Sequence, residues 1–218
     1  FASNEMAIVF HEDSKYADII NAQNWYEILL KEDVIYGRAD PNSDPCGYRS
    51  VMTTQLTALL EGNPEILNIL DKDQNYIRPK EVDLLGLLEA NAIDYIYIYK
   101  SVAKQHHLNI VTLSDSINLS KPEFKDWYSA AKVDIFGKKP GEYVSLIGSP
   151  MVYGITALND APNKMAANAF LQFFFDKEKG MKIIEEQGQA SVIPAVSSSY
   201  EKIPSALKKF AKKELKCL

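Results

Sequence analysis

Residues 39–50 read ADPNSDPCGYRS, and this stretch decides how the chain around it is predicted to fold. It follows the apolar run Val34–Tyr36, whose β-branched and aromatic residues favour a strand. It precedes apolar residues at helical spacing, namely Val51, Leu56, Leu59 and Leu60. The stretch is therefore expected to join a strand to a helix, where free backbone N–H groups and the helix dipole favour an anion.

Composition narrows the class of protein. With 218 residues and 46% hydrophobic content, the chain can bury the core of one large domain or two small ones. A net charge of −5 and scattered lysines argue against nucleic acid as a partner. The two cysteines, Cys46 and Cys217, are too few for a disulfide framework and lack the spacing of a zinc site. No apolar run approaches the roughly 20 residues of a membrane helix.

Strand-like and helix-like segments alternate up to Leu113. This alternation predicts an α/β fold with a mainly parallel sheet flanked by helices. The predicted strands are 6–10, 34–37, 76–77, 93–99 and 109–113, and the predicted helices are 51–62, 82–88 and one that begins at 101.

The pattern becomes less regular after Leu113. Strands are predicted at Lys132–Phe136, Tyr143–Ile147 and Met151–Leu158, and helices at 161–174 and 180–187. The Lys-rich tail, Ser205–Lys216, is predicted to be a solvated amphipathic helix.

Three predicted strand ends carry polar side chains that could share a pocket. Ligands of open α/β sheets lie beyond the carboxyl ends of the strands, where this chain places Asp44, Glu81 and Tyr99. An Asp or Glu at the first turn of a helix also has an ordinary structural role in capping that helix. The positions alone leave both interpretations open.

Cys46 with His106 or His107 could also suggest a thiol nucleophile and its base. The two histidines are adjacent, so on a helix they point about 100° apart, and no third residue is indicated to orient either one. We therefore do not predict catalysis from these residues.

Ordered motifs give the chain a family resemblance. DPCGYRS at 44–50 is followed by RPKEVDLL at 78–85 and by YKSVA at 99–103. NWYEIL at 24–29 and PMVYGI at 150–155 fit the same pattern. Together they closely resemble the tungstate/molybdate-binding proteins of ABC importers, over nearly the whole chain to about Gln189.

The resemblance implies a periplasmic-binding-protein fold of type II, in which two α/β lobes close on an oxyanion. On this basis residues 1–10 are expected to be a hinge strand and a remnant of the first lobe. Residues 11–148 are expected to form a complete second lobe. Residues 149–218 are expected to return to the first lobe, which is partial, and to end in C-terminal helices.

The resemblance also implies roles for four residues. Asp44 and Glu81 would bond to the tungsten or molybdenum centre itself, while the Tyr99 hydroxyl and the backbone N–H of Cys46 would hold the oxyanion oxygens. The implied function is capture of tungstate or molybdate for an ABC transporter permease, without catalysis and without a cofactor. The implied location is periplasmic or extracellular, with membrane contact through the permease or through a lipid anchor in the full-length protein.

Two alternatives and one reservation accompany this interpretation. Two carboxylates and a phenol also suit a divalent cation, because a carboxylate repels a dianion. An enzyme on the same fold is the second alternative.

The chain begins in an apolar strand, Met6–Phe10, without the two serine-bearing loops of the family's first lobe. We therefore expect it to hold half a site and to bind oxyanion weakly or not at all.

Overall fold

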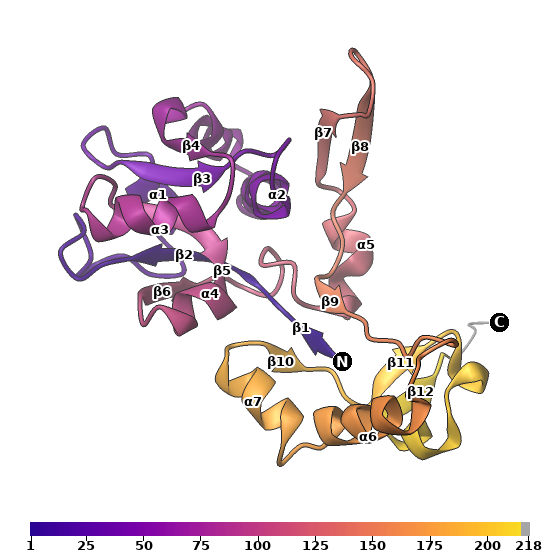
Figure 1. Ribbon diagram of the computed structural model, residues 1–218. Helices are drawn as coiled ribbons and strands as arrows, with labels where there is room; N and C mark the ends of the chain where they lie inside the picture. Colours follow the sequence, from indigo (N-terminus) through magenta and orange to yellow (C-terminus); the bar gives the residue numbers. More distant parts are fainter. Residues whose placement is uncertain (215–218) are drawn as a thin grey trace. The chain divides into compact units, whose positions relative to one another are not determined.

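The computed structural model describes residues 1–214, and the chain divides into two compact units (Figure 1). The larger unit comprises Asn4–Met151, and the smaller combines Phe1–Ser3 with the chain from Val152 onward. The sequence assigned residues 1–10 to a hinge and the first lobe. In the structure, strand β2 (Met6–Phe10) is hydrogen-bonded within the sheet of the larger unit.

The larger unit is built on a five-stranded sheet in the order β4-β3-β5-β2-β6 (Figure 1). Besides β2, its strands are β3 (Tyr36–Ala39), β4 (Ile77–Arg78), β5 (Tyr95–Tyr99) and β6 (Asn109–Thr112). Strand β3 pairs in parallel with β4 and β5, whereas β2 pairs antiparallel with both β5 and β6. The sheet is therefore mixed, with β2 running against the other four strands.

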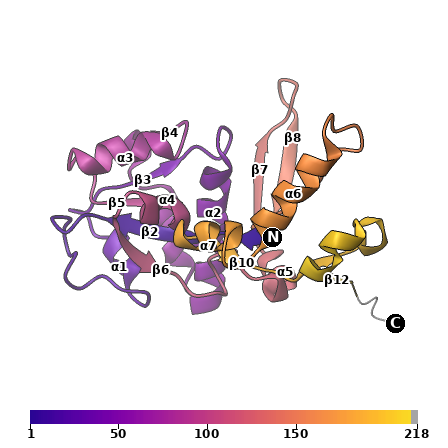
Figure 2. The same cartoon turned by 60° about the horizontal axis from the view of Figure 1, so that its bottom comes forward.

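Helices cover both faces of this sheet, because its central strands are apolar on both sides. Met6, Ile8 and Phe10 of β2 share one core with helices α1 (Trp25–Leu29) and α2 (Pro45–Glu61). Ala7 and Val9, which alternate with them, share the opposite core with α3 (Val82–Glu89) and α4 (Lys100–Gln105). Figure 2 shows the same layers from a second direction.

Helix α2 begins within residues 39–50. Asp44 caps its first turn, Pro45 occupies the position where a missing N–H costs nothing, and Gly62 ends it in the left-handed conformation (φ 61°). The apolar stripe predicted for this helix was wrong in part. Leu59 and Leu60 are 53% and 47% exposed, while Thr53, Thr54 and Thr57 lie on the buried face beside Leu56.

Short elements complete the larger unit: η1 (Pro64–Leu70), η2 (Gln74–Tyr76), η3 (Pro122–Phe124) and α5 (Lys125–Tyr128). A hairpin of β7 (Lys132–Phe136) and β8 (Tyr143–Ile147) follows, at the residues predicted from the sequence. Gln55 of α2 binds the start of this hairpin through two hydrogen bonds of 2.9 Å with the backbone of Lys132.

The described residues of the smaller unit form two short sheets, two α-helices and two short 3-10 helices. Strand β1 (Ala2–Ser3) lies between β9 (Val152–Tyr153) and β10 (Ala190–Ser191), and β11 (Ala195–Ser197) pairs in parallel with β12 (Ala211–Lys213). The helices are α6 (Lys164–Phe175), α7 (Gly180–Glu186) and the short η4 (Tyr200–Lys202) and η5 (Ser205–Phe210). The strand predicted at Met151–Leu158 is confined to β9.

The Lys-rich tail differs from its prediction. It forms η5 and then β12 in place of one amphipathic helix, and residues 215–218, with Cys217, lie outside the described residues.

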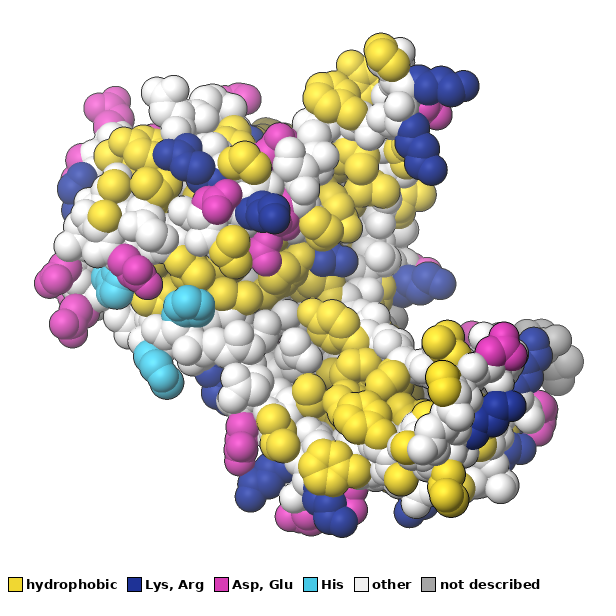
Figure 3. Space-filling view, viewed as in Figure 1, with side chains coloured by type: hydrophobic (Ala, Val, Ile, Leu, Met, Phe, Trp, Pro, Cys, Tyr) yellow, Lys and Arg dark blue, Asp and Glu magenta, His cyan; other side chains and the backbone are white. Residues whose placement is uncertain are grey.

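A cavity of about 800 Å³ lies in the smaller unit, lined by β9, α6 and η5 and by the chain between them. Hydrophobic side chains gather on this unit in Figure 3. Within residues 1–214, no helix is both long and apolar enough to cross a membrane.

Candidate functional site

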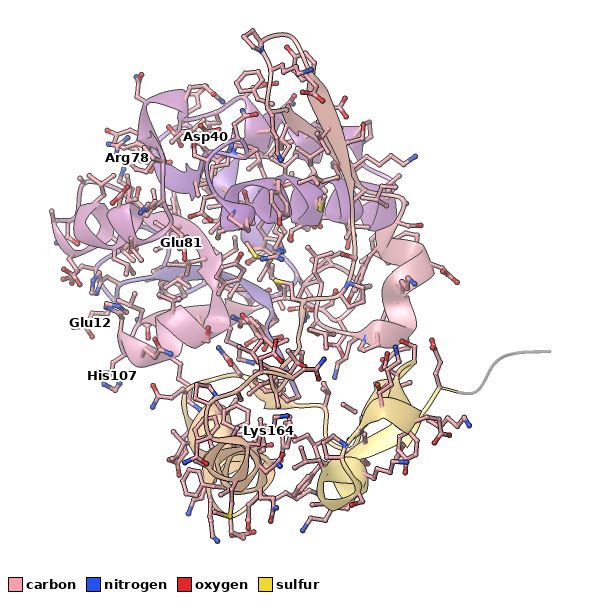
Figure 4. The ribbon with its side chains drawn as sticks, turned by 45° about the vertical axis from the view of Figure 1, so that its right-hand side comes forward. Glu12, Asp40, Arg78, Glu81, His107 and Lys164 are labelled. Atoms are coloured by element: carbon pink, nitrogen blue, oxygen red, sulfur yellow. The ribbon has the colours of Figure 1, made fainter. Side chains whose placement is uncertain are left out.

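The candidate site lies where strands β3, β4 and β5 of the larger unit end. The backbone N–H of Asp40 donates to the carbonyl of Arg78 at 2.7 Å, so the loop after β3 and the turn after β4 are held side by side. Asp40 itself is occupied locally, since its carboxylate accepts from the backbone N–H of Asn42 and from the Ser43 hydroxyl, both at 2.9 Å. Figure 4 shows Asp40, Arg78 and Glu81 along one side of this unit.

Two carboxyl groups from different helix N-termini meet at this edge. Asp44 is buried at the start of α2, and Glu81 is half-buried at the start of α3. The backbone N–H of Glu81 donates to Asp44 Oδ2 at 3.4 Å, and the two side chains are close enough to share a hydrogen bond. Burial, followed by that hydrogen bond and the negative charge of Asp44, raises the pKa of Glu81 to about 7. At neutral pH Glu81 is therefore about half protonated.

The raised pKa of Glu81 predicts that the stability of the protein depends on pH. Because folding raises the pKa of Glu81 from 4.5 to about 7, its contribution is complete below pH 4.5 and is lost as the pH rises through 7. The melting temperature of the wild type relative to Glu81→Gln should therefore fall between about pH 4.5 and about pH 8. Because Glu81 is only partly buried, solvent screening limits the change in the free energy of unfolding to about 1 kcal/mol, which corresponds to roughly 2–4 °C in melting temperature.

The matched control for this titration is Glu89→Gln, which removes an exposed carboxylate from the other end of α3. Thermal melts across this pH range compare the melting temperatures of the wild type, Glu81→Gln and Glu89→Gln. If the melting temperatures of the wild type and of Glu81→Gln change with pH in parallel, the raised pKa of Glu81 is contradicted.

Cys46 is fully buried under the same edge. Its backbone N–H donates to Asp44 Oδ1 at 2.7 Å, so the donor expected to hold a ligand oxygen is engaged by the N-cap carboxylate. Its thiol contacts the carbonyl of Tyr97 (Sγ to O, 3.7 Å), and burial raises the pKa of the thiol well above its usual value. A thiol in this state is a poor nucleophile.

His106 and His107 are exposed, and Figure 3 shows the histidines on the surface.

Tyr99 ends strand β5 and has a cationic neighbour that the sequence analysis did not select. Arg49, in the second turn of α2, donates from Nη1 to the Tyr99 hydroxyl at 2.5 Å. Its guanidinium carbon lies 5.6 Å from the centre of the Tyr99 ring and 5.4 Å from that of Tyr48. The signal was present in the DPCGYRS motif, but only the strand pairing that brings Tyr99 to α2 gives Arg49 a partner.

The structure thus brings the four predicted residues into one neighbourhood. The charges of Asp44 and Glu81 raise the pKa of the Cys46 thiol after burial, and Glu81 also contributes to the raised pKa of Tyr99. In the part of the chain that the structure describes, no cluster of three or more His, Cys, Asp or Glu side chains could hold a metal ion.

Residues 1–189 match the model of a family described as bacterial extracellular solute-binding proteins. The chain belongs to this family. A solute-binding protein from Petrotoga mobilis is 47% identical over 97% of this chain and 66% of its own length. The molybdate/tungstate-binding protein WtpA of Pyrococcus abyssi is 42% identical over 95% of this chain and 65% of its own. The WtpA of Thermococcus kodakarensis is 41% identical over 95% and 63%.

The chain spans about two thirds of the length of these relatives. Solved structures agree on the fold. The substrate-binding domain assigned to a molybdenum ABC transporter of Clostridium difficile covers 88% of the chain, which in turn spans 65% of that structure, with a TM-score of 0.50 and 16% identity. PEB3 with bound L-phospholactate gives the same TM-score and covers the same share at 11% identity. The predicted periplasmic-binding-protein type of α/β fold is confirmed.

Proposed function

We propose that this chain captures tungstate or molybdate through the edge of its larger unit and belongs to an ABC importer. The observation that carries the proposal is the pairing of Asp44 with Glu81 across two helix N-termini, next to Tyr99 and Arg49. The WtpA relatives, named for binding these oxyanions, support the choice of ligand.

The charges of the site suit a dianion better than its two carboxylates suggest. At neutral pH Glu81 is about half protonated, so the pair carries less negative charge than two free carboxylates, and Arg49 adds a permanent positive charge nearby. The carboxyl oxygens would bond to the electron-poor metal centre of the oxyanion, and the Tyr99 hydroxyl would donate to one of its oxygens. The backbone N–H of Cys46 could join only if ligand binding draws Asp44 Oδ1 away from it.

In this proposal the chain has no catalytic step and no resident cofactor. The tungsten or molybdenum arrives and leaves as cargo. The partner that accepts it is the permease of the importer, and the place of capture is outside the cytoplasmic membrane, in keeping with a family of extracellular solute-binding proteins. A lipid anchor in the full-length protein would keep capture close to that permease.

Nuclear magnetic resonance of the ¹⁵N-labelled chain tests the ligand even if affinity is only millimolar. Tungstate and molybdate should shift the amide signals of residues 44, 46–49, 81 and 99, whereas sulfate, an equally charged tetrahedral anion, should not. A response of these residues to calcium but not to tungstate would replace the proposal with the divalent-cation alternative. Submicromolar affinity for tungstate would contradict the expectation that the chain holds half a site.

Glu81→Gln should weaken tungstate binding roughly tenfold or more, the equivalent of about 1.4 kcal/mol, because an amide is a poorer donor to the metal centre. The fold should persist, since Glu81 is half-buried and its backbone contact to Asp44 remains. The amide-shift titration measures the change, with Glu89→Gln as the control on the same helix. Equal affinities for wild type and Glu81→Gln would reject the role of Glu81.

A further inference from the structure

Arg49 is held at three points, all on aromatic residues of the site. Its Nη1 donates to the Tyr99 hydroxyl, and its guanidinium lies within cation–π range of the rings of Tyr48 and Tyr99. The side chain is half-buried, so few rotamers satisfy these contacts together. Arg49 and Tyr99 come from different elements, α2 and β5, and their contact ties the helix to the end of the strand.

The direction of this hydrogen bond fixes what the Tyr99 hydroxyl can do. A phenol has one O–H to donate and lone pairs that accept. A guanidinium has donors only, so Arg49 occupies an acceptor position of the oxygen and repels the hydroxyl hydrogen. That hydrogen then points away from Arg49. Burial raises the pKa of Tyr99 far above neutrality, so the hydrogen is present at physiological pH.

We propose that Arg49 is a positioning residue for the oxyanion, since its guanidinium holds Tyr99 with the hydroxyl hydrogen directed at a ligand oxygen. This inference rests on the proposed function, in which Tyr99 donates to tungstate or molybdate. A hydroxyl free to rotate would lose part of its bond strength to the entropy of ordering it, and it could also turn a lone pair toward the anion. Arg49 prevents both.

A double-mutant cycle separates positioning from a direct effect of charge. Arg49→Met and Tyr99→Phe should each weaken tungstate binding about tenfold in the amide-shift titration, the loss expected for one charge-assisted hydrogen bond. Combined, they should weaken it little more than Tyr99→Phe alone, because Arg49 acts through the hydroxyl. Arg49→Lys should recover part of the loss, since lysine keeps a donor but not the planar fork.

The control is Lys138→Met, which removes the same charge from the exposed turn of the β7–β8 hairpin and should leave affinity unchanged. If Arg49→Met weakens binding as much in the Tyr99→Phe background as in the wild type, Arg49 acts on the ligand directly and the inference is overturned. Loss of affinity in Lys138→Met matching that in Arg49→Met would overturn it equally.

A ligand-free measurement keeps this test apart from the proposed function. In the wild type the guanidinium of Arg49 should give hindered, slowly exchanging Nη signals, and Tyr99→Phe should release them. If tungstate fails to bind but this release is seen, the choice of ligand is wrong while the Arg49–Tyr99 contact stands. If Tyr99→Phe leaves the Arg49 signals unchanged, the contact is absent and the inference fails whatever the ligand.

Discussion

Gly47→Ala is expected to lower the melting temperature of the larger unit by roughly 6–12 °C, from a loss of about 3 kcal/mol. A Cβ at this position would lie 2.5 Å from the carbonyl carbon of Asp40 and 2.6 Å from the carbonyl oxygens of Ala39 and Asp40. All three atoms belong to the backbone at the end of β3, so no side chain can rotate to make room. The first turn of α2 would have to move away from the strand.

The same substitution at Gly86 is the matched control. Gly86 lies inside α3, and a Cβ there would meet nothing within 4 Å. Gly86→Ala should therefore raise stability by about 0.5–1 kcal/mol through helix propensity and a less flexible unfolded chain.

Tryptophan fluorescence follows unfolding of the larger unit specifically, because both tryptophans, Trp25 and Trp127, lie within it. A Gly47→Ala protein that melts with the wild type would show that α2 does not need its close approach to β3. The substitution should also separate Asp44 from Glu81. The pH dependence of stability assigned to the raised pKa of Glu81 should therefore be reduced in this variant.

The second large effect is expected from Leu56→Ala, at a loss of about 3 kcal/mol. Leu56 is fully buried in the middle of α2, within the core that α2 shares with β2 and β5. Truncation removes its contacts and leaves a cavity that the surrounding aromatic side chains can fill only in part.

Leu59→Ala tests the same truncation less than one turn further along the helix. Leu59 is 53% exposed, so its loss should change stability by no more than about 0.5 kcal/mol. Urea unfolding followed by tryptophan fluorescence compares the two variants. Similar midpoints would mean that α2 buries the leucine face predicted from the sequence rather than the threonine face seen in the structure.

Much of the larger unit's fold could be predicted from the sequence. Apolar runs marked β2 and β5, the residues of β7 and β8 were predicted as two strands, and Gly62 marked the end of α2. The direction of β2 could not be predicted, because a fully buried strand has the same apolar pattern whichever way it runs. The buried face of α2 was predicted incorrectly for a related reason. Thr54 is buried because it forms a hydrogen bond with Tyr97 (2.9 Å), a partner that is distant in sequence.

The candidate site could be predicted in part. Position at strand ends selected Asp44, Glu81 and Tyr99, and the structure places all three in one neighbourhood. Their assigned roles toward a ligand stay predictions. Arg49 was missed because its partner is 50 residues away, and the engagement of the Cys46 N–H by Asp44 follows from cap geometry that sequence spacing does not fix.

The position of β2 has a consequence for biosynthesis. This strand lies between β5 and β6, and it pairs Met6 with Tyr99 and Phe10 with Asn109. At about 5–20 residues per second, a ribosome makes β2 roughly 5–20 seconds before its neighbours exist. During that time the apolar segment MAIVF has no partner strand and is a site for a chaperone or for aggregation. The five-stranded sheet of the larger unit therefore cannot be completed cotranslationally until about residue 112 has emerged.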